Sequence, residues 1–305
     1  MTPQNVTTDI REAAEVLLRG GIIGLPTETV YGLAALAEIQ KAVMRVFSTK
    51  GRPTSHPLII HLGTSVDPEE WGKFNPAAMA LARTFWPGPL TLLVPRTDRV
   101  PDWVTGGRDT VALRVPSHPV AQQLLNTVKT GVVAPSANRF GKVSPTTAEH
   151  VVEDLGSDVD LVLDGGACNI GVESTIVECI GDTVIVLRPG AISSDDILRV
   201  TALSLASQDE DIRAPGMLAS HYAPRAHVLL FDNLKDAEEK VREITSNGQS
   251  SCVLNHVDVN VYAERLYADL RDADASHVEV ICAVLPSSEG IGAAVRDRLA
   301  KAAHR

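Results

Sequence analysis

The chain has 305 residues, of which 44% are hydrophobic and 22% are charged, and its formal net charge at pH 7 is −10. This composition is ordinary for a globular chain that buries one large core or two smaller ones, and no apolar run approaches the ~18 residues of a membrane span. The acidic excess is shared evenly by residues 1–203 and 204–305, which argues against tight, nonspecific nucleic-acid binding by either part.

The N-terminus and the cysteines indicate the compartment. The stretch MTPQNVTTDIREA is neither basic nor apolar, so no secretory signal is predicted and a cytoplasmic location without membrane attachment is expected. The cysteines form no CxxC pair, so we expect neither a zinc site nor a disulfide. They are Cys168, Cys179, Cys252 and Cys282.

The first predicted elements alternate between helix and strand, as in a βαβ unit. In chain order they are a helix over residues 9–19 capped by Thr8 or Asp9, a buried strand over 20–25 stopped by Pro26, a helix over 38–49 that ends at Gly51, and a strand over 58–60.

The alternation continues to about residue 203 and predicts an open, twisted, mixed α/β sheet with flanking helices. The strand at 110–116 alternates Val111, Leu113 and Val115 with Thr110 and Arg114, which predicts one polar face. The other elements are helices at 75–85, 117–130, 146–155 and 193–200, strands at 90–95, 132–134 and 160–166, and a hairpin of 174–179 with 183–188.

The remaining residues predict a linker and a second domain. Residues 204–226 have no sustained periodicity, whereas residues 227–305 alternate strand and helix as a small, Rossmann-like α/β domain. Its predicted elements are strands at 227–231, 251–254 and 277–285 and helices at 235–245, 261–271 and 289–302.

Polar side chains gather around the first two strands. Thr27, Glu28 and Thr29 follow the first strand, and Lys50 and Arg52 follow the second helix. Cations at a helix end are favoured by the helix dipole and suit phosphate oxygens. One interpretation is a phosphate-binding site at the edge of the sheet. The other is that these are ordinary polar residues in the loops of a βαβ unit, without a ligand.

The motifs also resemble a known family. PTETVYGL followed by KGRPxxxPLIIH resembles the YrdC-like domain of threonylcarbamoyl-AMP synthases, and LRVP, APSAN, SP, ESTIV and LRPG follow in the family's order. PGM…HYAPRA and the tail LPSSEGIGAAVRDRLAKAA resemble the linker and C-terminal domain of the long form. One departure is His56, which stands before Pro57 where the family usually has Asn.

The resemblance implies a nucleotidyltransferase reaction. L-threonine, bicarbonate or CO₂, and ATP would give L-threonylcarbamoyladenylate and pyrophosphate, with Mg²⁺ bound mainly through ATP phosphates and no metal site of the protein's own. The product would pass to a tRNA threonylcarbamoyltransferase, which forms threonylcarbamoyladenosine next to the anticodon, and the contact with tRNA itself would be weak.

The matched motifs assign roles to particular residues. Lys50 and Arg52 would be catalytic. The threonine site would comprise Thr29, His61, Arg114, Ala134 (through its backbone) and Ser174. The ATP site would comprise Lys50, Arg52, His56, Thr110, Ser136, Ser144, Arg188 and Tyr222.

The residues themselves support part of this assignment. Lys50, Arg52 and Arg188 suit a triphosphate, because several cations are needed and guanidinium groups fit phosphate oxygens. Arg114 lies in an apolar strand and needs an anionic partner, either a protein carboxylate or, as the resemblance implies, the threonine carboxylate. Ser136 lacks a GxSxG context, so no enzyme nucleophile is expected.

Two other functions stay open at this stage. A double-stranded RNA or tRNA-binding module could use Lys50, Arg52, Arg139 and Lys142 on a concave surface. A carbamoyltransferase component like those of hydrogenase maturation would carry acylphosphatase-like and zinc-finger segments, which the cysteine pattern does not offer.

The linker is predicted to act as an active-site lid. Residues 215–225 contain Met217, Leu218, His221 and Tyr222, side chains with apolar surface to bury, unlike a passive tether. The resemblance to the long form implies that this segment covers the active-site opening and that Tyr222 reaches the nucleotide. We expect Tyr222 to be partly exposed and the lid to close over bound substrates.

Overall fold

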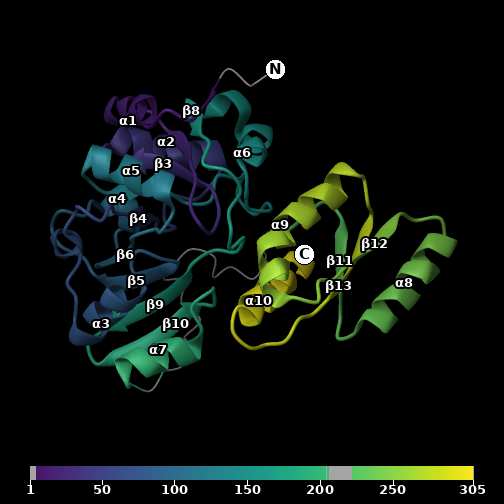
Figure 1. Cartoon of the computed structure of the whole chain (residues 1–305). Coiled ribbons are helices and arrows are strands. Elements are labelled where there is room, and N and C mark those ends of the chain that lie inside the picture. Colours follow the sequence, from purple (N-terminus) through teal and green to yellow (C-terminus); the bar gives the residue numbers. More distant parts are fainter. Residues whose placement is uncertain (1–4, 204, 206–221, 305) are drawn as a thin grey trace.

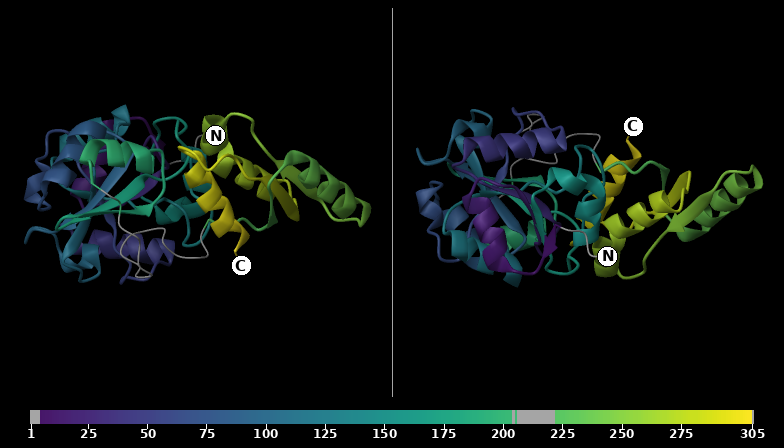
Figure 2. Two further views of the ribbon diagram at one scale, coloured as in Figure 1. Left: turned by 90° about the horizontal axis from the view of Figure 1, so that it is seen from below. Right: turned by 90° about the horizontal axis from the view of Figure 1, so that it is seen from above.

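The computed structural model describes residues 5–203, 205 and 222–304. It contains two lobes that lie side by side, with the larger one built from the N-terminal part of the chain (Figures 1 and 2). The larger lobe has a mixed sheet and the smaller lobe a parallel one. The predicted fold class is therefore confirmed.

The larger sheet has ten strands, and both parallel and antiparallel neighbours occur in it. In spatial order the strands are β1 (Val6–Thr7), β8 (Leu161–Leu163), β2 (Ile23–Leu25), β3 (Gly32–Leu36), β7 (Val132–Val133), β4 (Ile59–His61), β6 (Thr110–Arg114), β5 (Leu90–Pro95), β9 (Thr175–Ile180) and β10 (Thr183–Arg188).

Helices flank this sheet. They are α1 (Ile10–Leu18), α2 (Gln40–Lys50), α3 (Pro76–Phe85), α4 (Asp102–Thr105), α5 (Pro119–Val128), α6 (Ala148–Leu155) and α7 (Ser194–Thr201), with short 3₁₀ turns η1 (Pro68–Glu70) and η2 (Gly156–Asp158). The Asp9 side chain caps α1, and Gly51 ends α2 in the left-handed conformation, as the sequence predicted.

Strand β3 was missed by the sequence prediction, which therefore named a simple βαβ unit where the chain forms an antiparallel β2–β3 pair. Its sequence, GLAAL, consists mostly of residues with low strand propensity. The small residues serve packing: a Cβ on Gly32 would lie 2.8 Å from the Cβ of Ala134. Tertiary packing thus overrides local propensity here.

Strand β6 forms where the alternation predicted a strand. It lies between β4 and β5 inside the sheet, and every residue after Thr110 is buried. The face that carries Arg114 is therefore buried, and it is polar at Arg114, which contributes to a cavity. The alternation itself is real, because Leu113 and Val115 belong to the core on the opposite side.

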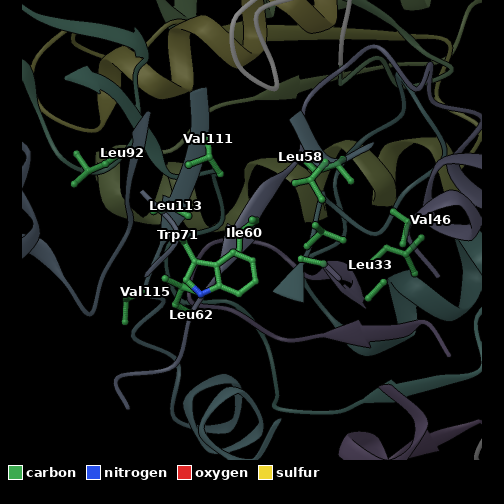
Figure 3. Packing of buried hydrophobic residues seen from close by; sticks show 14 of the residues in the cluster. Leu33, Val46, Leu58, Ile60, Leu62, Trp71, Leu92, Val111, Leu113 and Val115 are labelled. Carbon is green, nitrogen blue, oxygen red and sulfur yellow. The ribbon is translucent and has the colours of Figure 1, made fainter. Parts of the chain in front are cut away.

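That core packs on Trp71, whose side chain is fully buried. Ile60, Leu62, Leu113 and Val115 surround the indole (Figure 3). Residues 59 and 61 project from the other face of β4, because successive strand residues point to opposite faces. The site is thus built on the face opposite Trp71, where His61 and Arg114 lie beside a smaller apolar cluster that includes Ile59.

The smaller lobe has a parallel sheet in the order β11 (His227–Phe231), β13 (Val280–Val284) and β12 (Ser251–Leu254). Its helices are α8 (Leu234–Ser246), α9 (Val259–Ala275) and α10 (Gly292–Ala303). Helices α9 and α10 lie on the side of the larger lobe, whereas α8 lies on the far side (Figures 1 and 2).

The two lobes share buried contacts. Arg271 of α9 forms an ion pair with Asp154 at 2.5 Å and donates to the Val143 carbonyl at 2.6 Å. Val30 and Val172 of the larger lobe belong to the same apolar cluster as the core of the smaller lobe. The lobes are therefore packed together rather than merely connected.

Most of the predicted lid (204 and 206–221) lies outside the described residues, including Met217, Leu218 and His221. None of the described helices is long and apolar enough to cross a membrane. The division at residues 203 and 227 stays a prediction.

We predict that residues 1–203 fold without the rest of the chain. Three of the apolar clusters consist of their buried side chains alone, so a cooperative unfolding transition is expected in denaturant. The fragment should be less stable than the whole chain, by up to about 3 kcal/mol for each apolar side chain it exposes. An aggregated or molten fragment would show that the boundary is wrong.

Candidate functional site

A cavity of about 50 Å³ opens on the face of the larger sheet opposite Trp71, beside the smaller lobe. Strands β4, β6 and β10, the end of α2, and the loops after β2, after β7 and before β9 supply most of its wall. The lining residues are Thr29, Val30, Lys50, Arg52, Ile59, His61, Arg114, Ala134, Pro135, Ser136, Glu173, Ser174, Arg188 and Tyr222.

All the residues proposed for threonine binding line this cavity. Strand pairing explains how: His61 of β4 lies opposite Arg114 of β6, and the Ala134 amide donates to the Ile59 carbonyl at 3.2 Å. Thr29, after β2, accepts a hydrogen bond from Arg114 at 2.9 Å. Residues distant in sequence thus meet through the sheet register.

The partner of Arg114 in the structure is a protein carboxylate. Its Nη2 lies 2.8 Å from Oε1 of Glu28, and both side chains are 4% exposed. Burial alone would raise the pKa of Glu28, but the charge of Arg114 and its hydrogen bond lower that pKa below its usual value. The pair is therefore ionised, and it fixes the guanidinium at the cavity wall.

His61 is a neutral imidazole in this environment. Burial, assisted by repulsion from Arg114, lowers the pKa of His61 to about 3. Its Nδ1 has no hydrogen-bond partner among the described residues. A neutral imidazole with an open nitrogen can exchange a hydrogen bond with a ligand without adding charge.

Ser174 and Arg188 form a second part of the wall. Arg188 donates through Nε to the Ser174 carbonyl at 3.0 Å and through Nη2 to its hydroxyl at 3.1 Å. The Ser174 hydroxyl also lies 2.8 Å from that of Thr91. The turn after Arg188 needs glycine, because a Cβ on Gly190 would lie 2.3 Å from the Thr175 amide nitrogen.

Lys50 and Arg52 bring two more cations to the cavity. Lys50 donates to the carbonyls of Ser136 at 2.5 Å and Asn138 at 2.7 Å. Burial and the charge of Arg52 hold the pKa of Lys50 well below its usual value. Burial also lowers the pKa of Arg52 to about 10, and Arg188 acts in the same direction. Like charges buried together favour an anion between them.

Three of the residues proposed for ATP binding do not line the cavity. Ser144 is buried and donates to Glu173 at 2.7 Å. His56 lies with its ring 5.7 Å from that of Phe140, and burial together with Arg52 lowers its pKa. Thr110 begins β6. Ser136 and Tyr222 do line the cavity.

Glu173 was missed by the sequence analysis. It is the one carboxylate among the described lining residues, and it accepts hydrogen bonds from Ser144, Tyr267 and Arg298 at 2.7, 2.8 and 2.8 Å. The signal was a charged residue inside the otherwise apolar or small run GVESTIV. Its partners on α9 and α10 could not be identified from that run.

Tyr222 corrects another expectation, because its side chain is 1% exposed rather than partly exposed. Its ring stacks on Tyr267 with centroids 5.6 Å apart, and the Arg298 guanidinium lies 5.4 Å from its centroid. Burial, with the nearby Glu173 charge, raises the pKa of Tyr222 to about 12. Tyr222 thus forms a wall of the cavity on the side of the smaller lobe.

The basic surface proposed for RNA is not present. Lys50 and Arg52 are 3% and 8% exposed, so they cannot lie along a nucleic-acid stem. Arg139 is exposed but is paired with Asp158 at 2.5 Å. Within the part of the chain that the structure describes, no group of three or more His, Cys, Asp or Glu side chains could hold a metal ion.

We predict that Glu173 makes stability depend on acidity. Burial alone would raise its pKa from 4.5, but the charges of Arg298 and Arg188 and its hydrogen bonds lower it to about 2. Its ionised form therefore stabilises the fold above about pH 4.5, and this contribution is lost as pH falls toward 2. The difference in unfolding free energy between wild type and Glu173→Gln, measured by denaturant titration, should shrink by up to about 3 kcal/mol over that range. A difference that does not change with pH would contradict the prediction.

Both lobes match known protein families. A family profile named Sua5_yciO_yrdC, with the description "Telomere recombination", matches residues 15–190. A second profile, described as "Threonylcarbamoyl-AMP synthase, C-terminal domain", matches residues 186–304.

Individual relatives cover almost the whole chain. Threonylcarbamoyl-AMP synthase of Pyrococcus abyssi is 38% identical and covers 96% of this chain and 93% of the relative. That of Bacillus subtilis is 36% identical, with 96% and 92% covered. The crystal structure of P. abyssi Sua5 complexed with L-threonine matches with a TM-score of 0.90 at 37% identity, over 96% of this chain and 94% of that one. The chain therefore belongs to the threonylcarbamoyl-AMP synthases, a family of nucleotidyltransferase-type enzymes, in the long form that carries a C-terminal domain.

Proposed function

We propose that this protein forms L-threonylcarbamoyladenylate and pyrophosphate from L-threonine, bicarbonate or CO₂, and ATP. The observation that carries the proposal is one cavity lined both by Thr29, His61 and Arg114 and by the cations Arg52 and Arg188. The first group suits an amino acid and the second a polyphosphate. The threonine complex of the P. abyssi relative supports this assignment.

Arg114 would bind the threonine carboxylate. A guanidinium has five N–H donors, so Arg114 can hold Glu28 and Thr29 and still donate to a ligand. Glu28 already balances the charge of Arg114. Arg114 would therefore contribute to threonine binding mainly by donating hydrogen bonds that orient the carboxylate. His61 would contact the bound amino acid as a neutral imidazole, since its pKa of about 3 excludes the charged form near pH 7.

The reaction needs positioning more than it needs an enzyme nucleophile. The neutral threonine amine adds to CO₂ and loses a proton, giving a carbamate. A carbamate oxygen then attacks the α-phosphorus of ATP, the bond to the bridging oxygen of the β-phosphate breaks, and pyrophosphate leaves. Lys50, Arg52 and Arg188 would neutralise charge on the phosphates during this displacement.

The small, partly enclosed cavity suits an unstable intermediate. A carbamate decomposes readily in water, and exclusion of water prevents that side reaction. The cavity of about 50 Å³ is small for both substrates, so the wall would have to open to admit ATP and threonine. We therefore keep the lid as a proposal, with the buried Tyr222 as the described part of the segment.

Magnesium and the later steps complete the proposal. Mg²⁺ would bind mainly through ATP phosphate oxygens, as is usual for this ion, because both oxygens of Glu173 already accept hydrogen bonds. The product would pass to a tRNA threonylcarbamoyltransferase that modifies the adenosine next to the anticodon, with only weak contact between this protein and tRNA.

The direct test is pyrophosphate release from ATP with Mg²⁺, omitting threonine and bicarbonate in turn. We expect release only when all components are present, together with a product of the mass of threonylcarbamoyladenylate. Serine should be a poorer substrate, because the loss of one methyl contact costs roughly 1–3 kcal/mol. Pyrophosphate release that is independent of threonine would overturn the proposal.

We also predict that substitutions separate the two substrates. Arg52→Ala and Arg188→Ala should mainly raise the KM for ATP, since they remove phosphate contacts, whereas Arg114→Ala should mainly raise the KM for threonine. Initial rates with each substrate varied in turn give the measurement.

Arg114→Ala leaves Glu28 as an uncompensated buried charge, which is strongly destabilising. The Arg114→Ala/Glu28→Gln double variant removes that charge, and Glu28→Gln alone is its matched control. An unchanged threonine KM in the folded double variant would remove Arg114 from the threonine site.

A further inference from the structure

The smaller lobe places one arginine against the wall of the cavity. Arg298 projects from α10, the helix that faces the larger lobe (Figure 1), and its side chain is 0% exposed. A buried guanidinium requires partners for its charge and its donors. Those partners lie partly in the other lobe, next to residues of the proposed active site.

Two hydrogen bonds of Arg298 cross between the lobes. Nε of Arg298 donates to Oε2 of Glu173 at 2.8 Å, and Nη2 donates to the Pro189 carbonyl at 3.1 Å. Glu173 immediately precedes Ser174, and Pro189 immediately follows Arg188. One side chain therefore holds the chain next to both of these cavity residues.

Residues of the smaller lobe hold the Arg298 side chain in place. Its Nη1 lies 2.5 Å from Oδ2 of Asp297, which also accepts from Lys301 at 2.9 Å. Tyr267 of α9 donates to the same Glu173 oxygen at 2.8 Å. The smaller lobe thus supplies two hydrogen-bond donors, Tyr267 and Arg298, to the Glu173 carboxylate.

Glu173 and the cation Arg188 line the same cavity. The charge of Arg188 is among the causes that lower the pKa of Glu173, after that of Arg298. If Arg298 were removed, Arg188 would be the principal charge left to balance the buried carboxylate. Because phosphate and carboxylate oxygens suit the same guanidinium donors, Glu173 would then compete with a nucleotide for Arg188.

We propose that Arg298 is a positioning residue for the nucleotide: by holding Glu173 and Pro189, it keeps Arg188 directed at the phosphates of ATP. The inference rests on the proposed function. It assigns the C-terminal lobe a part in building the ATP site, although Arg298 is not among the lining residues.

The first experiment compares Arg298→Met with Arg296→Met in the full-length chain. Arg296 lies on the same helix but donates to the Pro286 carbonyl within its own lobe. Arg298→Met should raise the KM for ATP by at least about tenfold, since it breaks a buried charge pair, with a much smaller effect on the KM for threonine. Arg296→Met should leave both values unchanged.

The second experiment distinguishes charge competition from loss of structure. Adding Glu173→Gln to Arg298→Met removes the competing carboxylate, so the KM for ATP should fall back toward the wild-type value although both partners are gone. Arg298→Lys keeps the charge but lacks the fork that reaches two acceptors, and it should give an intermediate KM. Thermal unfolding of each variant gives the fraction of protein that is folded at the assay temperature. The measured rates are divided by that fraction.

The outcomes separate this inference from the proposed function. If the wild type releases no threonine-dependent pyrophosphate, the proposed function fails. If the wild type is active but the Arg298→Met and Arg296→Met variants have equal ATP KM values, the positioning role is wrong. It is also wrong if Glu173→Gln does not improve ATP use in the Arg298→Met background, because the role of Arg298 would then be structural alone.

Discussion

The burial of positive charge beside one small cavity is the constraint on which the site depends. Lys50, Arg52, Arg114 and Arg188 are each at most 8% exposed, and a buried cation is stable only with compensating partners. Arg114 has Glu28, whereas the acceptors of Lys50 among the described residues are the backbone carbonyls of Ser136 and Asn138. The site is therefore suited to an anionic ligand, because a polyphosphate would supply the charge that the protein supplies only in part.

The sheet makes this burial compatible with a stable core. Strand β4 directs Ile60 toward Trp71 and directs His61 to the cavity on the opposite face. Apolar side chains on both faces anchor the strands, so the strands can hold polar groups that would be less fixed on a loop. The smaller lobe adds a further buried cation, because Arg298 of α10 forms an ion pair with Glu173 of the larger lobe.

Several features could be predicted from the sequence because residues close together in the chain determine them. The caps of α1 and α2 follow from Asp9 and Gly51, and the β9–β10 hairpin follows from two apolar runs joined by a short polar turn. The ordered motifs identified the family, because each keeps its residue types at fixed spacing. Strand β3 was missed because its glycine and alanines have a packing role that is invisible without Ala134 beside them.

The sequence by itself indicated the fold class, most of the elements and most of the described residues that line the cavity, but not Glu173. Only the tertiary structure decided how those residues are paired: Arg114 with Glu28, Ser144 with Glu173, and Glu173 with Arg298, which is 125 positions away in the chain. The physical reason is that motifs and caps are set by neighbours along the chain. The partner of a buried charge is set by strand register and by the docking of two lobes, which a local pattern does not encode.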